Sequence, residues 1–154
     1  MPKRHGGRAG PSGFTLVEVL IVVAILGILA VVVAPQFGKT ISQSKEAALA
    51  SNLLMIRKIF ERYRVQHDDT YPVVFAAQLL ITTNKAGLPG TEYGPYLRTG
   101  FPKNPINGDS SVITVVKMPD GPTGTSGWIY ALTDGDFRAN VSGTASSDVP
   151  YFEM

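Results

Sequence analysis

The sequence contains no cysteine and only two histidines. Without cysteine the chain has no disulfide framework, no thiolate metal site, no thiol nucleophile and no cysteine for a lipid anchor. His5 and His67 lie far apart, and neither has the neighbours of a zinc site or a catalytic triad. The second half of the chain also shows no polar cluster suited to catalysis. The sequence therefore predicts a protein that is not an enzyme.

Acidic residues are missing from the first thirteen positions, "MPKRHGGRAGPSG", which carry Lys3, Arg4 and Arg8. The remaining chain holds eleven basic residues, fourteen less these three, and twelve acidic ones, so it is nearly neutral. A nucleic-acid surface needs clustered basic residues, and none is predicted. A basic N-terminus before an apolar segment instead predicts a membrane orientation with the N-terminus in the cytoplasm.

A long apolar run extends from Phe14 to Ala34, "FTLVEVLIVVAILGILAVVVA". It is long enough to cross a membrane as a helix, exceeds the core of a cleavable secretory signal, and lacks a good cleavage site at its far end. Glu18 interrupts it, although a carboxylate in a bilayer helix costs roughly 2.5–3.5 kcal/mol. Pro35 follows and removes one helical hydrogen bond, which predicts a kink.

The segment 36–67, "QFGKTISQSKEAALASNLLMIRKIFERYRVQH", has the periodicity of an amphipathic helix. Its apolar residues recur at steps of three and four, which places them on one face. They are Leu49, Leu53, Ile56, Phe60 and Tyr63, with Met55 and Ile59 widening the stripe. Such a stripe is more often a core than a binding surface. We therefore expect one long kinked helix from about Phe14 to about His67, with its second half packed on a domain.

Beyond the long helix the periodicity weakens. Residues 73–83, "VVFAAQLLITT", fit either a short helix or a buried strand, and we favour the helix. Residues 87–108 are dense in Gly, Pro and Asn, which predicts an irregular loop.

Three strand candidates follow this loop, at residues 111–118, 127–133 and 136–142. The last two flank Asp134-Gly135, a strong hairpin signal. The predicted fold class is α+β: a long kinked N-terminal helix, transmembrane in its first half and amphipathic in its second, packed on a small antiparallel sheet of about three strands. The tail, residues 143–154, is expected to be loosely ordered.

The N-terminal region resembles the precursors of type IV pilins and of type II secretion pseudopilins. In that family a short basic leader ends in glycine, and a membrane peptidase cuts before an aromatic residue. The resemblance implies cleavage between Gly13 and Phe14, N-methylation of Phe14, and a helix kink at Pro35. It also implies that Glu18 docks onto the charged amine of Phe14 on a neighbouring subunit. Opposite charges paired in a low dielectric offset part of the cost of burying them.

The second half of the chain is similar to G-type major pseudopilins in its loop "YGPYLRTGFPKNPING" and its hairpin "GWIYALTDGDFRANVS". Many type IV pilins close a C-terminal loop with a cysteine pair, which this sequence lacks. G-type pseudopilins often hold one calcium ion, and Asp134 and Asp136 are weak candidates, although "TDGD" is more simply a hairpin turn. No other cofactor is expected. Asn140 begins the glycosylation sequon "NVS", a pattern that often arises by chance.

The resemblance implies a fibre subunit, and the major pseudopilin of a type II secretion system fits best. A subunit of a type IV pilus or of a DNA-uptake pilus is the close alternative, and only the DNA-uptake pilus would involve nucleic acid. A signal-anchored membrane protein with a small periplasmic binding domain is a distant one. The implied partners are other copies of the chain, the prepilin peptidase, the inner-membrane assembly platform, the minor pseudopilins and the membrane.

The same resemblance implies a single-pass protein of the bacterial inner membrane with a cytoplasmic N-terminus. We divide it into a cleaved leader (1–13), a membrane and assembly helix (14–35) and a periplasmic domain (36–154). Within that domain we expect the amphipathic helix (36–67), a variable loop region (68–110), the sheet (111–142) and the tail (143–154).

Overall fold

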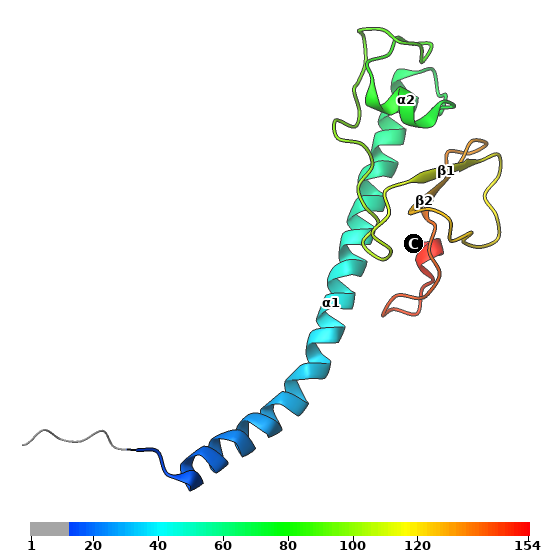
Figure 1. Cartoon of the computed structure of the whole chain (residues 1–154). Coiled ribbons are helices and arrows are strands. Elements are labelled where there is room, and N and C mark those ends of the chain that lie inside the picture. Colours follow the sequence, from blue (N-terminus) through cyan, green and yellow to red (C-terminus); the bar gives the residue numbers. More distant parts are fainter. Residues whose placement is uncertain (1–12) are drawn as a thin grey trace, which may run out of the picture. The chain divides into compact units, whose positions relative to one another are not determined.

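A computed structural model describes residues 13–154, with the backbone alone at positions 34–35 and 75–76 (Figure 1). The expected leader therefore lies outside the described residues, apart from Gly13. The chain forms two compact units, one ending at Thr40 and one comprising Ile41–Met154. Helix α1, Leu16–Gln66, begins in the first unit and continues into the second.

The first unit consists of the apolar start of α1. Every large apolar side chain from Leu16 to Val33 is at least 42% exposed, so the described part of the chain leaves these residues largely uncovered. Among the described residues, α1 alone is long and apolar enough to cross a membrane. Exposure of this kind is stable in lipid and unfavourable in water. Helical structure continues past Pro35, and the expected kink there stays a prediction.

The second unit contains the rest of α1, a short helix α2 and a three-stranded sheet (Figure 1). The elements are α2 (Phe75–Leu80), β1 (Val112–Val115), β2 (Trp128–Ala131), β3 (Phe137–Ala139) and a final 3-10 turn η1 (Tyr151–Glu153). The α+β class, the short helix and the three strands are confirmed. No helix or strand falls between residues 87 and 108, as the loop prediction requires.

The sheet has the order β1-β2-β3 and is mixed. Strands β2 and β3 are antiparallel, with Trp128 opposite Ala139, as the hairpin signal predicts. Strands β1 and β2 are parallel, with Val112 opposite Trp128, so the expectation of a wholly antiparallel sheet was wrong. Parallel neighbours need a long crossover, and residues 116–127 provide it.

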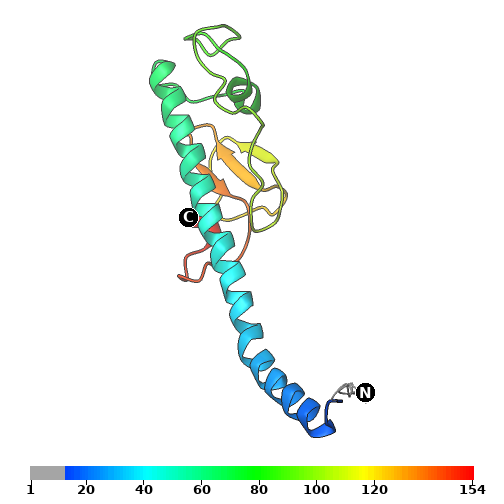
Figure 2. The ribbon, with the colours of Figure 1, turned by 90° about the vertical axis from the view of Figure 1, so that its left-hand side faces the viewer.

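The core lies between the sheet and the second half of α1. The predicted stripe is confirmed: its five main residues, Leu49, Leu53, Ile56, Phe60 and Tyr63, are at most 2% exposed. Phe60 is the central contact, with ring centroids 5.1 Å from Tyr130 and 5.5 Å from Phe137. Figure 2 shows α1 running along one side of the sheet. Met55 is 42% exposed and lies outside the core.

Two buried asparagines fasten the loops to the sheet. Asn104 donates from Nδ2 to the carbonyl oxygen of Gly127 (2.7 Å). Asn140 donates to Ser126 Oγ (2.8 Å) and accepts from the Thr123 amide (2.7 Å). Both asparagines are 0% exposed, so their amides are satisfied internally, as buried polar groups must be. The sequon asparagine is therefore a core residue with no free side chain.

The tail is packed against α1, so the expectation of a loosely ordered tail was wrong. Phe152 in η1 is buried, and Arg57 donates to the carbonyl oxygens of Met154 (2.8 Å) and Phe137 (3.0 Å). Nearer the start of the second unit, Ser146 donates to the Glu46 carboxylate (2.6 Å). Hydrogen bonds from Ser146 lower the pKa of Glu46. Two charged residues of α1 thus hold the tail at both ends.

Candidate assembly site

The residues that the sequence singles out for processing lie at the free start of α1. Phe14 is 80% exposed. A Cβ added at Gly13 would meet no atom of residues 13–154 within 4 Å, so this described part of the fold does not require glycine there. A need for glycine at this position would have to come from another molecule. Glu18 lies in the first turn of α1, four residues after Phe14.

Glu18 and Thr15 form a reciprocal capping box at the helix start. The Glu18 amide donates to Thr15 Oγ1 (3.2 Å), and the Thr15 amide donates to Glu18 Oε2 (3.4 Å). This pairing satisfies two of the amides that a helix N-terminus leaves without partners. This capping box was not predicted above, although "TLVE" followed by an apolar run is its sequence signature.

The capping box holds a negative charge against the positive end of the helix dipole. Its Thr15–Glu18 bond of 3.4 Å is long, and a carboxylate can accept several hydrogen bonds, so Glu18 keeps capacity for a cation. The Phe14 nitrogen is one residue before the amide that Glu18 accepts from. The carboxylate therefore accepts from the residue that directly follows Phe14, where the predicted cleavage would create an amine.

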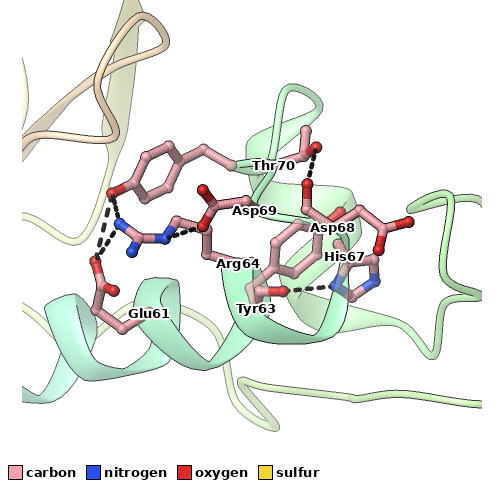
Figure 3. A network of polar contacts seen from close by, with 8 residues as sticks. Glu61, Tyr63, Arg64, His67, Asp68, Asp69 and Thr70 are labelled. Carbon is pink, nitrogen blue, oxygen red and sulfur yellow. Dashed lines mark hydrogen bonds and ion pairs between the residues drawn. The ribbon is translucent and has the colours of Figure 1, made fainter.

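A second polar cluster lies where α1 ends (Figure 3). The Arg64 guanidinium contacts Tyr71 Oη (2.9 Å), Asp69 Oδ1 (2.8 Å) and Glu61 Oε1 (3.4 Å). The hydrogen bond with Tyr71, followed by the charge of Glu61, raises the pKa of Arg64. Asp68 and Asp69 follow the helix with φ values of 51° and 63°, a left-handed conformation that ends helices. The cluster therefore lies at the C-terminal end of α1, where the chain leaves the helix.

His67 belongs to the same region and is buried, at 2% exposure. Its Nδ1 lies 2.8 Å from the Tyr63 carbonyl oxygen, which can only accept, so Nδ1 donates. Nε2 lies 2.9 Å from Thr83 Oγ1, and the ring stacks on Tyr63 at 3.8 Å. With both nitrogens bonded, His67 is a structural residue.

The two calcium candidates have partners within the hairpin turn. Asp134 Oδ1 accepts from the Asp136 amide (3.1 Å), and Asp136 Oδ2 pairs with Arg138 Nε (2.7 Å). Within residues 13–154 no three His, Cys, Asp or Glu side chains gather as metal ligands would. These contacts give both acids a role in the turn, and calcium binding stays a prediction.

Fold and site together define a class of protein. The protein has a long helix whose exposed first half is long enough to cross a membrane and is capped at its start by an acidic residue. The amphipathic second half of the same helix contributes to the core of a small α+β domain. Residues 8–34 match the family described as the prokaryotic N-terminal methylation motif.

Relatives extend the match beyond this motif. The chain is 26% identical over 110 residues to a type II secretion system core protein G of Klebsiella michiganensis, covering 70% of this chain and 76% of the relative. It is 37% identical over 60 residues to the protein of the same description from Pseudomonas aeruginosa, covering 39% and 42%. It is 27% identical over 140 residues to a type IV wide pilus major component of Thermus thermophilus, covering 88% and 92%. No solved structure matches this chain with significance.

The motif and these relatives support a pilin-like fibre subunit of the type IV pilin and type II secretion pseudopilin kind, with an N-terminal helix long and apolar enough to serve as a membrane anchor.

Proposed function

We propose that the chain is the major pseudopilin of a type II protein secretion system. The supporting observation is the likeness to core protein G, which spans 70% of this chain and so includes part of the folded domain as well as the shared helix. In this function the subunit polymerises into a short periplasmic fibre that helps to export folded proteins. It is a substrate of the prepilin peptidase and is not itself an enzyme.

Processing would convert a membrane protein into one that can assemble. Before cleavage, Lys3, Arg4 and Arg8 hold the N-terminus in the cytoplasm, and the Phe14 nitrogen is an uncharged amide. After cleavage between Gly13 and Phe14 that nitrogen becomes a cationic amine, which the peptidase then methylates. The amine of one subunit pairs with Glu18 of the next. An unpaired Glu18 in the bilayer would be penalised, so this pairing selects the axial register.

The proposed location follows from the same steps. The chain spans the inner membrane once, with its N-terminus in the cytoplasm and its α+β domain in the periplasm. The inner-membrane assembly platform would extract the mature subunit, and minor pseudopilins would complete the fibre.

A subunit of a type IV pilus is the second candidate. One observation favours it: the match to the Thermus thermophilus pilus component covers more of both chains than the core protein G match does. The two candidates make different predictions for a deletion strain. Loss of the secretion pseudopilin stops the export of folded proteins and leaves surface pili, whereas loss of the pilin does the reverse.

Intact mass spectrometry of the membrane-extracted chain tests the processing step. We expect a chain that begins at Phe14 and carries one added methyl group. A Gly13→Leu variant should keep its leader. Because an added Cβ at Gly13 meets no described atom within 4 Å, we would assign that result to the peptidase. An uncut wild-type chain in cells that contain the peptidase would refute the proposal and favour a signal-anchored protein.

A further inference from the structure

The loop before β1 contains the dipeptide Asn107-Gly108, and no other asparagine of the chain is followed by glycine. In such a pair the glycine amide nitrogen can attack the side-chain carbonyl carbon of the asparagine, because glycine has no Cβ to hinder the approach. The new C–N bond closes a succinimide ring, and the side-chain nitrogen leaves as ammonia. Water then opens the ring at either carbonyl, which gives aspartate or isoaspartate.

The carboxamide of Asn107 is held at both of its polar atoms. Its Nδ2 donates to the carbonyl oxygen of Ser126 (3.2 Å), and its Oδ1 accepts from the Asp109 amide (3.1 Å). Ser126 is 2% exposed, so the first bond joins the loop to a buried residue. A group bonded at both ends has one orientation, and turning its carbonyl carbon toward another nitrogen breaks at least one of these bonds.

The attacking nitrogen is occupied as well. The Gly108 amide donates to the carbonyl oxygen of Asn104 in a bond of 2.7 Å. This nitrogen must lose its proton before it can attack, and solvent reaches a hydrogen-bonded amide proton only when the structure opens locally. Gly108 has a φ of 75°, a conformation that favours glycine. The turn therefore requires the residue that makes the pair reactive, and the same turn blocks the reaction.

Asn104 fastens this loop to the sheet. It is 0% exposed, and its Nδ2 donates to the carbonyl oxygen of Gly127 (2.7 Å). Its Oδ1 accepts from the Ile106 amide (2.9 Å), and its own amide donates to the carbonyl oxygen of Asp109 (2.8 Å). Because these bonds share one residue, we expect the segment 104–109 to open as a unit.

We propose that Asn107 is a self-modification site, blocked while the loop 104–109 is closed and reactive when it opens. The reaction consumes one water, releases one ammonia and needs no enzyme or cofactor. Neither product has the Nδ2 donor for the Ser126 carbonyl, and isoaspartate also carries an extra methylene in the main chain. A modified loop cannot close as before, so the modification records that the loop has opened. This inference does not depend on the proposed fibre.

The first test measures deamidation of the full-length chain in detergent, in mildly alkaline buffer made with water enriched in heavy oxygen. Peptide masses then identify each asparagine modified during the incubation. In urea that unfolds the domain, Asn107 should react first. Without urea it should react more slowly, by a factor at least as large as the hydrogen-exchange protection factor of the Gly108 amide, since both processes require that amide to be released. A smaller factor, or no reaction at Asn107 in urea, would overturn the proposal.

The second test concerns the product. Asn107→Asp removes the donor to Ser126, so the Gly108 amide should exchange faster than in the wild type. Asn84→Asp is the matched control, because Asn84 uses its Oδ1 to accept from two amides of its own turn, and its Nδ2 forms no hydrogen bond within residues 13–154. That variant makes the same chemical change in another loop and should leave the exchange of Gly108 unaltered. Wild-type exchange in Asn107→Asp, or equal acceleration in both variants, would refute the claim that modification keeps the loop open.

Discussion

Replacing Glu18 with glutamine separates its capping of α1 from its proposed docking onto a neighbouring subunit. A capping box accepts Glu or Gln at this position, so the pairing with Thr15 can persist in the variant. Docking onto a neighbour's amine needs the negative charge, which glutamine lacks. Glu18→Ala removes both roles, so a comparison of the two variants assigns the effect of each.

The expected energies favour a clear outcome. Loss of the charge removes an insertion cost of roughly 2.5–3.5 kcal/mol, so the glutamine variant should insert at least as well as the wild type. Glu18→Ala also loses the hydrogen bond from the Thr15 amide, which costs the helix start about 0.3–1.5 kcal/mol. In the proposed fibre, either variant would leave the Phe14 amine of a neighbour without a partner, at a cost of several kcal/mol. That cost corresponds to roughly hundred- to thousandfold weaker subunit addition.

The assay is the yield of sheared fibres from cells in which cleavage of each variant has been confirmed by mass. We expect almost no fibres from Glu18→Gln or Glu18→Ala, and an intermediate yield from Glu18→Asp, which keeps the charge on a shorter side chain. If Glu18 served only as a helix cap, glutamine would behave as the wild type and alanine would show a mild defect. Normal fibre yield from cleaved Glu18→Gln subunits would end the docking argument.

Three further changes test the domain in the detergent-solubilised chain. Phe60→Ala should lower the free energy of unfolding by about 3–5 kcal/mol, measured with urea through the single buried tryptophan, and a loss under about 1 kcal/mol would mean that the core is elsewhere. Gly127→Ala should destabilise the domain because its Cβ would overlap the backbone oxygen of Asp109. Gly121→Ala, whose Cβ meets no described atom within 4 Å, should not, and equal melting temperatures would contradict this. The lowered pKa of Glu46 means that its bonds to Ser146 stabilise the tail above the ordinary carboxyl pKa of 4.5 and are lost as the pH falls through the lower folded value. In the wild type, hydrogen exchange in the tail should therefore rise on acidification. In Glu46→Gln, exchange corrected for its intrinsic rate should be high and independent of pH. Identical profiles for the two chains would refute this contribution of Glu46.

Much of the fold could be predicted because its signals are local. The apolar run and the three- and four-residue steps from Leu49 to Tyr63 depend only on neighbours along one helix, and the structure has α1 and its buried stripe where they indicate. The hairpin of β2 and β3 follows from turn residues at one site. The capping box of Thr15 and Glu18 is equally local, so it could have been predicted from the sequence "TLVE".

By itself, the sequence determined the elements of this protein: a helix that exposes one half to lipid, a second half with a single apolar face, three short strands and an acid placed at the helix start. Tertiary structure alone decided how distant segments meet. The parallel pairing of β1 with β2 depends on the path of a long connection, and the packed tail depends on Arg57 reaching Met154, 97 positions away. Helix and strand periods record which face of an element is apolar, but they carry no information about which remote partner satisfies a polar side chain. The burial of Asn104, Asn140 and His67 could not be predicted for that reason. Their hydrogen-bonding partners come into place only when the chain has folded.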